Sequence, residues 1–206
     1  MTSVDAVELG NLAFDLMRPR SAEDLISEAD FDRDERLPYW ADLWPSGLIL
    51  AARIAEERAS GRRLLELGCG VGLVTLAAMH AGWRVVATDY YEDALRFTRA
   101  NAWRALHREP AARLVDWRAF PSDLGTFDRV AAADVLYERP YAALVANALA
   151  VTVAPGGDAL IADPGRVAAG AFVEACEALG FTVARDTRPF EAGAIRQQIT
   201  IYALRR

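Results

Sequence analysis

The residues with the clearest chemical potential form a glycine-rich loop that follows an acidic residue. Glu66 ends a short apolar run, and the loop after it reads Gly68-Cys69-Gly70-Val71-Gly72. Glycine lets a backbone turn sharply and approach a ligand where a Cβ atom would collide. Leu73 stands where the dinucleotide fingerprint needs its third glycine, so that fingerprint is not met. A carboxylate before the loop repels a pyrophosphate but suits a ligand that carries a positive charge or hydroxyl groups.

Acidic residues mark the ends of the apolar runs that we interpret as parallel strands. These five acids are Glu66, Asp89, Asp116, Asp134 and Asp163. Ligands of open α/β sheets bind outside the carboxyl ends of the strands, near the switch in strand order. We therefore expect the five side chains to lie along one ligand-binding edge.

Asp89 stands 17 residues after Gly72, at the end of the second predicted strand. A carboxylate in this place can accept hydrogen bonds from both ribose hydroxyls of a nucleoside, and Tyr90 would flank the adenine face. The same carboxylate could cap the helix that begins near Glu92, and the two roles are compatible. Asp89 is therefore our candidate for ribose contact.

Strands and helices alternate after residue 62. The predicted strands cover 64–67, 84–88, 113–117, 127–133, 159–162, 181–186 and 197–204, and the predicted helices cover 46–59, 71–81, 92–106, 141–153 and 168–179. Such alternation implies right-handed crossovers and a mainly parallel sheet. No helix separates the last two strands, so they should form an antiparallel hairpin. We expect an α/β fold over residues 38–206: a Rossmann-like, seven-stranded, mostly parallel sheet with helices on both faces.

The first part of the chain is acidic. Residues 1–38 hold ten acids and four arginines, so the whole net charge of −6 lies there. Residues 1–37 look partly helical, and we expect an N-terminal extension that is solvated or, alternatively, attracts a basic protein. The neutral remainder argues against a nucleic-acid partner. No apolar run has membrane-spanning length and no signal peptide is recognisable, so we expect no membrane partner and a cytoplasmic location.

The cysteines and histidines indicate no metal site. Cys69 and Cys176 form no disulfide framework, and a small residue that fits the loop explains Cys69 better than a nucleophile does. His80 and His107 fall on or beside predicted helices, away from the strand ends. Without a cysteine or an acid at ligand spacing, they argue against zinc, and we expect no metal.

The acid followed by Gly-x-Gly-x-Gly resembles motif I of the class I, or seven-strand, methyltransferases that depend on S-adenosylmethionine (SAM). The run Asp134-Val135-Leu136-Tyr137 after the fourth strand is similar to the Asp-x-x-Tyr motif of the family 16 group. Members of that group mostly modify lysine in proteins. The resemblance covers about residues 38–206.

Three further features resemble the branch that methylates the β subunit of electron-transfer flavoprotein. They are Pro-Tyr-Trp at residues 38–40, Trp44 before the first helix, and Asp-Pro-Gly-Arg at residues 163–166. The run Trp-Pro-Ser-Gly at residues 44–47 departs from the Gly-Gly pair expected in that branch. Bacterial relatives with this segment are often labelled nicotinamide N-methylase-like.

The resemblance implies a site for SAM, released as S-adenosylhomocysteine. The implied cofactor residues are Trp44, Glu66, Gly68, Cys69, Gly70, Gly72, Asp89, Tyr90, Asp116, Trp117 and Asp134, and the implied substrate residues are Tyr39, Trp40, Tyr137 and Arg166. Asp116 would accept a hydrogen bond from the adenine amine, and Trp117 would pack on its ring. Asp134 and Tyr137 are the candidates for catalysis, the first holding the acceptor amine and the second accepting a hydrogen bond through its hydroxyl.

Several alternatives stay open at this point. Asp134 could instead tie its loop to nearby backbone donors, and Arg166 could pair with Asp163 or with Asp134. The acceptor could be a protein lysine, or a small amine or pyridine such as a nicotinamide-like compound. A sensor that binds the cofactor without catalysis, or a dinucleotide-binding protein, is the non-enzymatic reading. The sequence does not indicate an oligomeric state.

Overall fold

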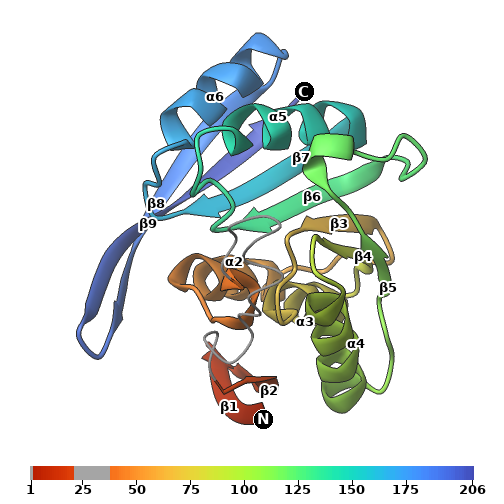
Figure 1. Ribbon diagram of the computed structural model, residues 1–206, viewed down its shortest axis with the longest axis vertical. Helices are drawn as coiled ribbons and strands as arrows, with labels where there is room; N and C mark the ends of the chain where they lie inside the picture. The colour runs from red at the N-terminus through yellow and green to blue at the C-terminus, as the bar shows by residue number, and fades with distance from the viewer. Residues whose placement is uncertain (1, 21–37) are drawn as a thin grey trace, which may run out of the picture.

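The computed structural model describes residues 2–20 and 38–206, and a seven-stranded sheet forms its centre (Figure 1). The strands are β3 (Arg63–Leu67), β4 (Arg84–Asp89), β5 (Ala111–Leu114), β6 (Phe127–Ala133), β7 (Val153–Asp163), β8 (Thr182–Ala192) and β9 (Ile195–Arg205). Their order is β5-β4-β3-β6-β7-β9-β8, and every pair is parallel except the two that involve β9. The mostly parallel sheet with a terminal antiparallel hairpin is confirmed.

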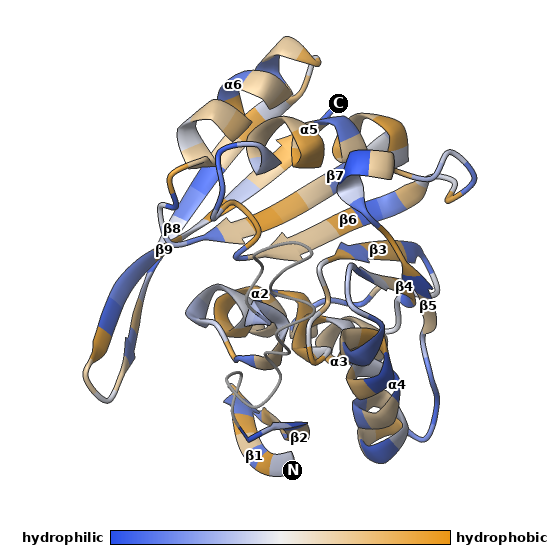
Figure 2. Ribbon diagram, viewed as in Figure 1, coloured by the Kyte–Doolittle hydropathy of each residue, from blue (hydrophilic) through white to orange (hydrophobic). Residues whose placement is uncertain are grey.

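Helices cover both faces of the sheet, as predicted (Figure 1). They are α2 (Pro45–Ala55), α3 (Leu73–His80), α4 (Glu92–Leu106), α5 (Tyr141–Thr152) and α6 (Ala169–Ala178). Successive side chains of a strand point to opposite faces, so Leu64 of β3 joins the core with α2 and α3, while Leu65 joins the core with α5 and α6. Figure 2 shows the resulting hydrophobic central strands. No helix in the described ranges combines the length and apolar character needed to cross a membrane.

Several element boundaries differ from the prediction. Strand β5 ends at Leu114, because Asp116 accepts a hydrogen bond from the backbone N–H of Arg118 and caps a short 3₁₀ helix, η3 (Trp117–Ala119). The Pro-Gly-Gly run at residues 155–157 lies inside β7 and does not close α5. Strands β8 and β9 extend past the end of β7 as a long arm (Figure 1).

The start of the chain is a β-hairpin, so the prediction of partly helical structure is wrong there. Strand β1 (Thr2–Leu9) pairs antiparallel with β2 (Leu12–Pro19). Alternate side chains of the hairpin enter the core beside α2 and α3, and these are Val7, Leu9, Phe14 and Leu16. The rest of the predicted extension, residues 21–37, lies outside the described residues. The hairpin thus shares a core with the main sheet.

Asn101 of α4 ties this hairpin to the glycine loop. Its Nδ2 donates to the backbone oxygens of Met17 at 2.8 Å and Val71 at 2.9 Å, and its Oδ1 accepts from the N–H of Met17 at 2.8 Å. The side chain is fully buried. All of its hydrogen-bonding groups are therefore satisfied by backbone.

Replacing Asn101 with alanine should lower the free energy of unfolding by about 2–4 kcal/mol, because buried backbone groups lose their partners. Urea unfolding followed by circular dichroism measures this change. Asn147→Ala is the matched control, since Asn147 is exposed on α5 and should change stability by less than about 0.5 kcal/mol. Equal effects of the two variants would contradict a fastening role for Asn101.

Candidate functional site

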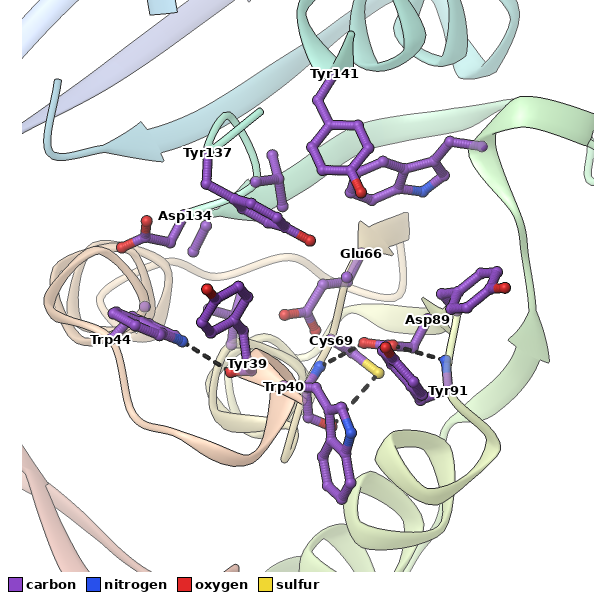
Figure 3. Close-up of a pocket in the computed structure, with 18 of the residues that line it drawn as sticks. Tyr39, Trp40, Trp44, Glu66, Cys69, Asp89, Tyr91, Asp134, Tyr137 and Tyr141 are labelled. Atoms are coloured by element: carbon purple, nitrogen blue, oxygen red, sulfur yellow. Dashed lines mark hydrogen bonds between the residues drawn. The ribbon is translucent and has the colours of Figure 1, made fainter. Parts of the chain in front are cut away.

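A cavity of about 240 Å³ opens at the carboxyl edge of the sheet. It lies at the boundary between β3 and β6, where the strand order reverses. The loops after β3, β4, β5 and β6 wall it, together with the segment that precedes and begins α2 (Figure 3). Open α/β sheets bind their ligands at such a switch point.

Four of the five strand-end acids line this cavity: Glu66, Asp89, Asp116 and Asp134. Asp163 does not, because it is fully buried beside the loop that follows β7. One of its carboxylate oxygens accepts hydrogen bonds at 2.7 Å from the backbone N–H groups of Gly165 and Arg166. Among the other predicted site residues, all within the described ranges, Gly72 and Arg166 also stand outside the lining.

The glycine loop adopts the backbone that only glycine accepts easily. Gly68, Gly70 and Gly72 have φ values of +73°, +55° and +94°. A Cβ atom on Gly70 would lie 2.9 Å from the backbone oxygen of Trp40, and one on Gly72 would lie 2.8 Å from Oγ1 of Thr98. The loop therefore passes closely between the aromatic segment and α4, and its conformation and packing both require glycine.

Glu66 is a buried acid at the base of the cavity (Figure 3). The hydroxyl of Thr75 donates a short hydrogen bond to its carboxyl group. Burial raises the pKa of Glu66 to about 8, and the nearby charge of Asp89 acts in the same direction. Without a cationic partner, this carboxyl group is therefore largely protonated at neutral pH.

Asp89 is held in place by two backbone donors. Its Oδ2 accepts from the N–H of Gly70 at 2.9 Å, and its Oδ1 accepts from the N–H of Tyr91 at 3.0 Å. Burial raises its pKa, and these two hydrogen bonds oppose the increase. The carboxylate thus closes the glycine loop on one side and holds the backbone at Tyr91, just before α4, on the other, while it still lines the cavity.

Cys69 is a buried thiol in the same loop. Burial first, and then the charges of Asp89 and Glu66, raise the pKa of Cys69 well above its ordinary value. The thiol sulfur accepts a hydrogen bond from the hydroxyl of Thr98 at 3.3 Å. A protonated buried thiol is a poor nucleophile, which supports the interpretation of Cys69 as a small residue that fits.

Aromatic rings form a continuous wall on the side of the cavity that faces the glycine loop and its acids (Figure 3). In order along the wall they are Trp44, Tyr39, Tyr137, Tyr141 and Trp117, with centroid separations of 6.0, 5.6, 5.0 and 5.5 Å. Each neighbouring pair meets edge to face, the arrangement that aromatic rings favour. This surface is apolar along the rings and polar at the hydroxyl and indole N–H groups.

Trp40 lies apart from that wall. Its ring packs against Tyr91 at 6.5 Å and against Phe97 of α4 at 5.6 Å, although it still borders the cavity. The sequence analysis placed Trp40 with Tyr39 among the substrate residues. The short helix η2 (Tyr39–Ala41) turns the chain between Tyr39 and Trp40, so the two side chains diverge.

Asp116 has a protein partner in this structure. The guanidinium of Arg118 binds its carboxylate through Nε at 3.0 Å and Nη2 at 2.8 Å. Arg118 also lies over the ring of Tyr90, at 5.6 Å from the centroid. The group predicted to meet an adenine amine is thus already paired, while Trp117 beside it borders the glycine loop at Gly68.

Asp134 and Arg166 are paired across two loops. Arg166 Nε donates to Asp134 Oδ1 at 2.7 Å, and Ser46 Oγ donates to Oδ2 at 3.1 Å. Of the two partners that the sequence left open for Arg166, the guanidinium takes Asp134, and its backbone N–H takes Asp163. Across residues 2–20 and 38–206, no three His, Cys, Asp or Glu side chains are grouped as metal ligands.

A family model described as a methyltransferase domain matches residues 28–197. The chain belongs to this methyltransferase domain family. Over 116 residues it is 32% identical to the protein-lysine methyltransferase METTL21E of Mus musculus, which covers 50% of this chain and 47% of that protein. Over 133 residues it is 33% identical to the electron transfer flavoprotein beta subunit lysine methyltransferase of Danio rerio, which covers 63% and 51%. The chain spans about half the length of these curated relatives.

Solved methyltransferases share the fold. The magnesium protoporphyrin IX methyltransferase of Synechocystis PCC 6803, solved with bound SAM, superposes with a TM-score of 0.66 at 19% identity. The likeness covers 89% of this chain and 94% of that one. The seven-strand architecture that the sequence predicted is thus the architecture of known methyltransferases.

Among the lining residues of this methyltransferase domain that the sequence analysis did not name are Tyr91, Arg118 and Tyr141. Tyr141 opens α5 four positions after Tyr137, and an aromatic residue so close to the Asp-x-x-Tyr run was a signal that could have found it. Tyr91 adjoins the predicted Tyr90, and either aromatic could have been chosen. Nothing in the sequence distinguishes Arg118 from the other arginines.

The residues present fit a nucleoside with a cationic tail. The glycine loop lines the cavity, and two buried carboxyl groups, Glu66 and Asp89, border the same space. Among residues 2–20 and 38–206, no basic side chain is a hydrogen-bond partner of Glu66 or Asp89. A ligand that brings hydroxyl groups and a positive charge satisfies both acids.

Proposed function

We propose that this methyltransferase domain uses SAM to methylate the lysine side chain of a protein. The observation that carries the proposal is the union of two features in one cavity: buried acids at a glycine loop, and an aromatic wall facing them. The first suits a nucleoside with a cationic tail, and the second suits an aliphatic stem that ends in an amine. The mouse and zebrafish relatives are named as lysine methyltransferases, which supports this acceptor class.

Glu66 and Asp89 are the residues proposed to hold the cofactor. Asp89 is oriented by Gly70 and Tyr91 and is placed to accept from ribose hydroxyls, while Glu66 offers a charge to the amino-acid end. Trp117 supplies a flat surface for the adenine ring. When bound, SAM supplies a methyl group activated by a sulfonium. The chain's own task is to orient the acceptor and to exclude water.

The acceptor amine is the group that the aromatic wall must prepare. A lysine amine has a pKa of about 10.4 in water, so it arrives protonated and must lose that proton before it reacts. Apolar rings disfavour the charged form by removing water, and this lowers the amine pKa. The hydroxyl groups of Tyr39 and Tyr137 can accept hydrogen bonds from the amine and aim its lone pair. Catalysis then rests on proximity and desolvation, without a covalent intermediate.

Methyl labelling of a lysate tests the acceptor. Protein extract from a strain that lacks the gene is incubated with the purified chain and methyl-labelled SAM. We expect label in one or a few protein bands and, by mass spectrometry, on lysine. The sequence contains no lysine, so every labelled lysine belongs to an added protein. Asp89→Ala, which loses the proposed ribose contact, is the inactive control.

The outcome separates the rival functions. Label confined to the small-molecule fraction would overturn the lysine acceptor and support a small amine or pyridine. Equilibrium binding separates a SAM-binding protein from a dinucleotide-binding protein, because SAM should bind and nicotinamide dinucleotides should not. The reverse preference would end the methyltransferase proposal. A methyltransferase domain over residues 38–206 and a cytoplasmic location belong to the same proposal.

A further inference from the structure

The Asp134 carboxylate joins segments that are far apart in the sequence. One oxygen accepts from Arg166 in the loop after β7, and the other accepts from Ser46 in the first turn of α2. The side chain is only 4% exposed, and Figure 3 shows the carboxylate directed away from Glu66 and Cys69. The acid thus uses both oxygens within the protein, outside the centre of the cavity.

Arg166 extends this connection to the aromatic wall. Its guanidinium lies over the ring of Trp44, at 5.3 Å from the centroid, while its Nε holds Asp134. The indole N–H of Trp44 donates to the backbone oxygen of Tyr39 at 2.9 Å. Asp163 accepts a hydrogen bond from the backbone N–H of Arg166, so the backbone and the guanidinium of Arg166 are each held by a carboxylate.

The backbone at Asp134 shows why such anchoring is needed. Its φ of +59° is left-handed, a conformation that aspartate adopts more readily than most residues other than glycine but that still favours a side chain held in place. Its N–H donates to the oxygen of Ala162 at 2.9 Å, and its side chain is held as described. The turn carries Tyr137, whose ring meets Tyr39 at 5.6 Å. Successive contacts therefore link Asp134 to Arg166, Trp44, Tyr39 and Tyr137, and Tyr137 belongs to the same turn as Asp134.

We propose that Asp134 and Arg166 form a latch that positions the aromatic segment at residues 39–44 against the turn at residues 134–137. In this inference Asp134 is a positioning residue, and it does not hold the acceptor amine. An incoming ammonium would have to displace a guanidinium that already neutralises the acid, with no gain in charge pairing. The geometry of the latch is independent of the proposed function, and only its effect on the acceptor rests on that function.

Hydrogen exchange on the cofactor-free protein tests the latch without any assay of activity. The variants are Arg166→Met and Asp134→Asn, since asparagine tolerates the left-handed turn but loses the charge. We expect the amides of Gly47 and Leu48, which donate to the oxygen of Trp44, to exchange about tenfold faster or more. Exchange in α4 should stay unchanged. Arg188→Met, which removes an exposed pair with Asp186 on the β8–β9 arm, is the matched control.

Unchanged exchange at Gly47 and Leu48 in both latch variants would overturn the proposal. Faster exchange throughout the protein would also overturn it, because it would indicate general destabilisation. The protein has many arginines on its surface, and the Arg188 control shows the effect of losing one of them alone.

Kinetics with the methyl acceptor then separate a latch from direct binding. A latch predicts that both variants raise the acceptor KM, that the double variant is no worse than either single one, and that Arg166→Lys restores part of the loss. Direct binding of the amine by Asp134 predicts instead that Arg166→Met leaves turnover unchanged or raises it. If the wild-type chain transfers no methyl group, the proposed function fails, while the exchange result still decides the latch.

Discussion

Replacing Gly70 with valine is expected to abolish measurable binding of SAM. The residue sits at φ +55°, where a β-branched side chain is strongly disfavoured. Its Cβ atom would also lie 2.9 Å from the backbone oxygen of Trp40, and a backbone atom cannot yield as a flexible side chain does. The loop or the aromatic segment must therefore move, and the hydrogen bond from Gly70 N–H to Asp89 is lost with it.

Isothermal titration with SAM measures the loss, and thermal unfolding shows that the variant still folds. Gly170→Val is the matched control, because Gly170 is an exposed residue of α6 and an added Cβ atom there meets nothing within 4 Å. Should the valine variant be unfolded, Gly70→Ala provides the milder change, with an expected loss of at least about a hundredfold in affinity. Affinity close to that of the wild type in either folded variant would contradict a cofactor site at this loop.

The sequence predicted the sheet well because its signals are local. Apolar runs, glycine stops and strand-end acids each occupy a few consecutive residues, so the alternation could be read directly. The same holds for the glycine loop, where the sequence indicated sharp turns and the structure has positive φ angles. The N-terminal hairpin was missed although it has a local signal: Val7 and Leu9 alternate with polar residues, as do Phe14 and Leu16, and Gly10 lies at the turn with φ +64°. There the polar composition was given more weight than the period of two.

The arrangement of the site was harder to predict, because it depends on contacts between distant segments. Arg166 had two carboxylates within reach in the sequence pattern, and the left-handed turn at Asp134 decides which one its guanidinium binds. Nothing in the order of residues reveals that turn, since most aspartates are not left-handed even though the residue tolerates this conformation. Likewise, the pairing of Asp116 with Arg118 accompanies the early end of strand β5 at Leu114, which the sequence did not predict. Residue types were thus predictable at this site, whereas side-chain directions were not.

Affinity for SAM is expected to rise about tenfold between pH 6 and pH 7. Burial places the pKa of Glu66 at about 8, so the cofactor-free protein holds a proton on this acid across that range. A neutral carboxyl group cannot pair with the positive charge of the ligand, so binding must expel the proton, and each unit of pH below 8 costs about a factor of ten. The rise should level off above pH 8, where the acid is ionised before the ligand binds.

The stability of the cofactor-free protein should change in the opposite direction. The folded chain binds the Glu66 proton more tightly than the unfolded chain, whose acid has its ordinary pKa of 4.5. The contribution of this proton to stability is complete below pH 4.5 and is lost as pH rises through about 8. One buried acid therefore predicts two opposed slopes, one for ligand affinity and one for unfolding.

Glu66→Gln separates this residue from every other titrating group. Glutamine is nearly isosteric and neutral at all these pH values, so it should flatten both slopes and weaken binding at pH 8 more than at pH 6. Titration calorimetry and urea unfolding at matched pH measure the two quantities. If the affinity slope persists in Glu66→Gln, the proton released on binding comes from another group. Asp89, whose pKa burial also raises, then becomes the acid that binding must deprotonate.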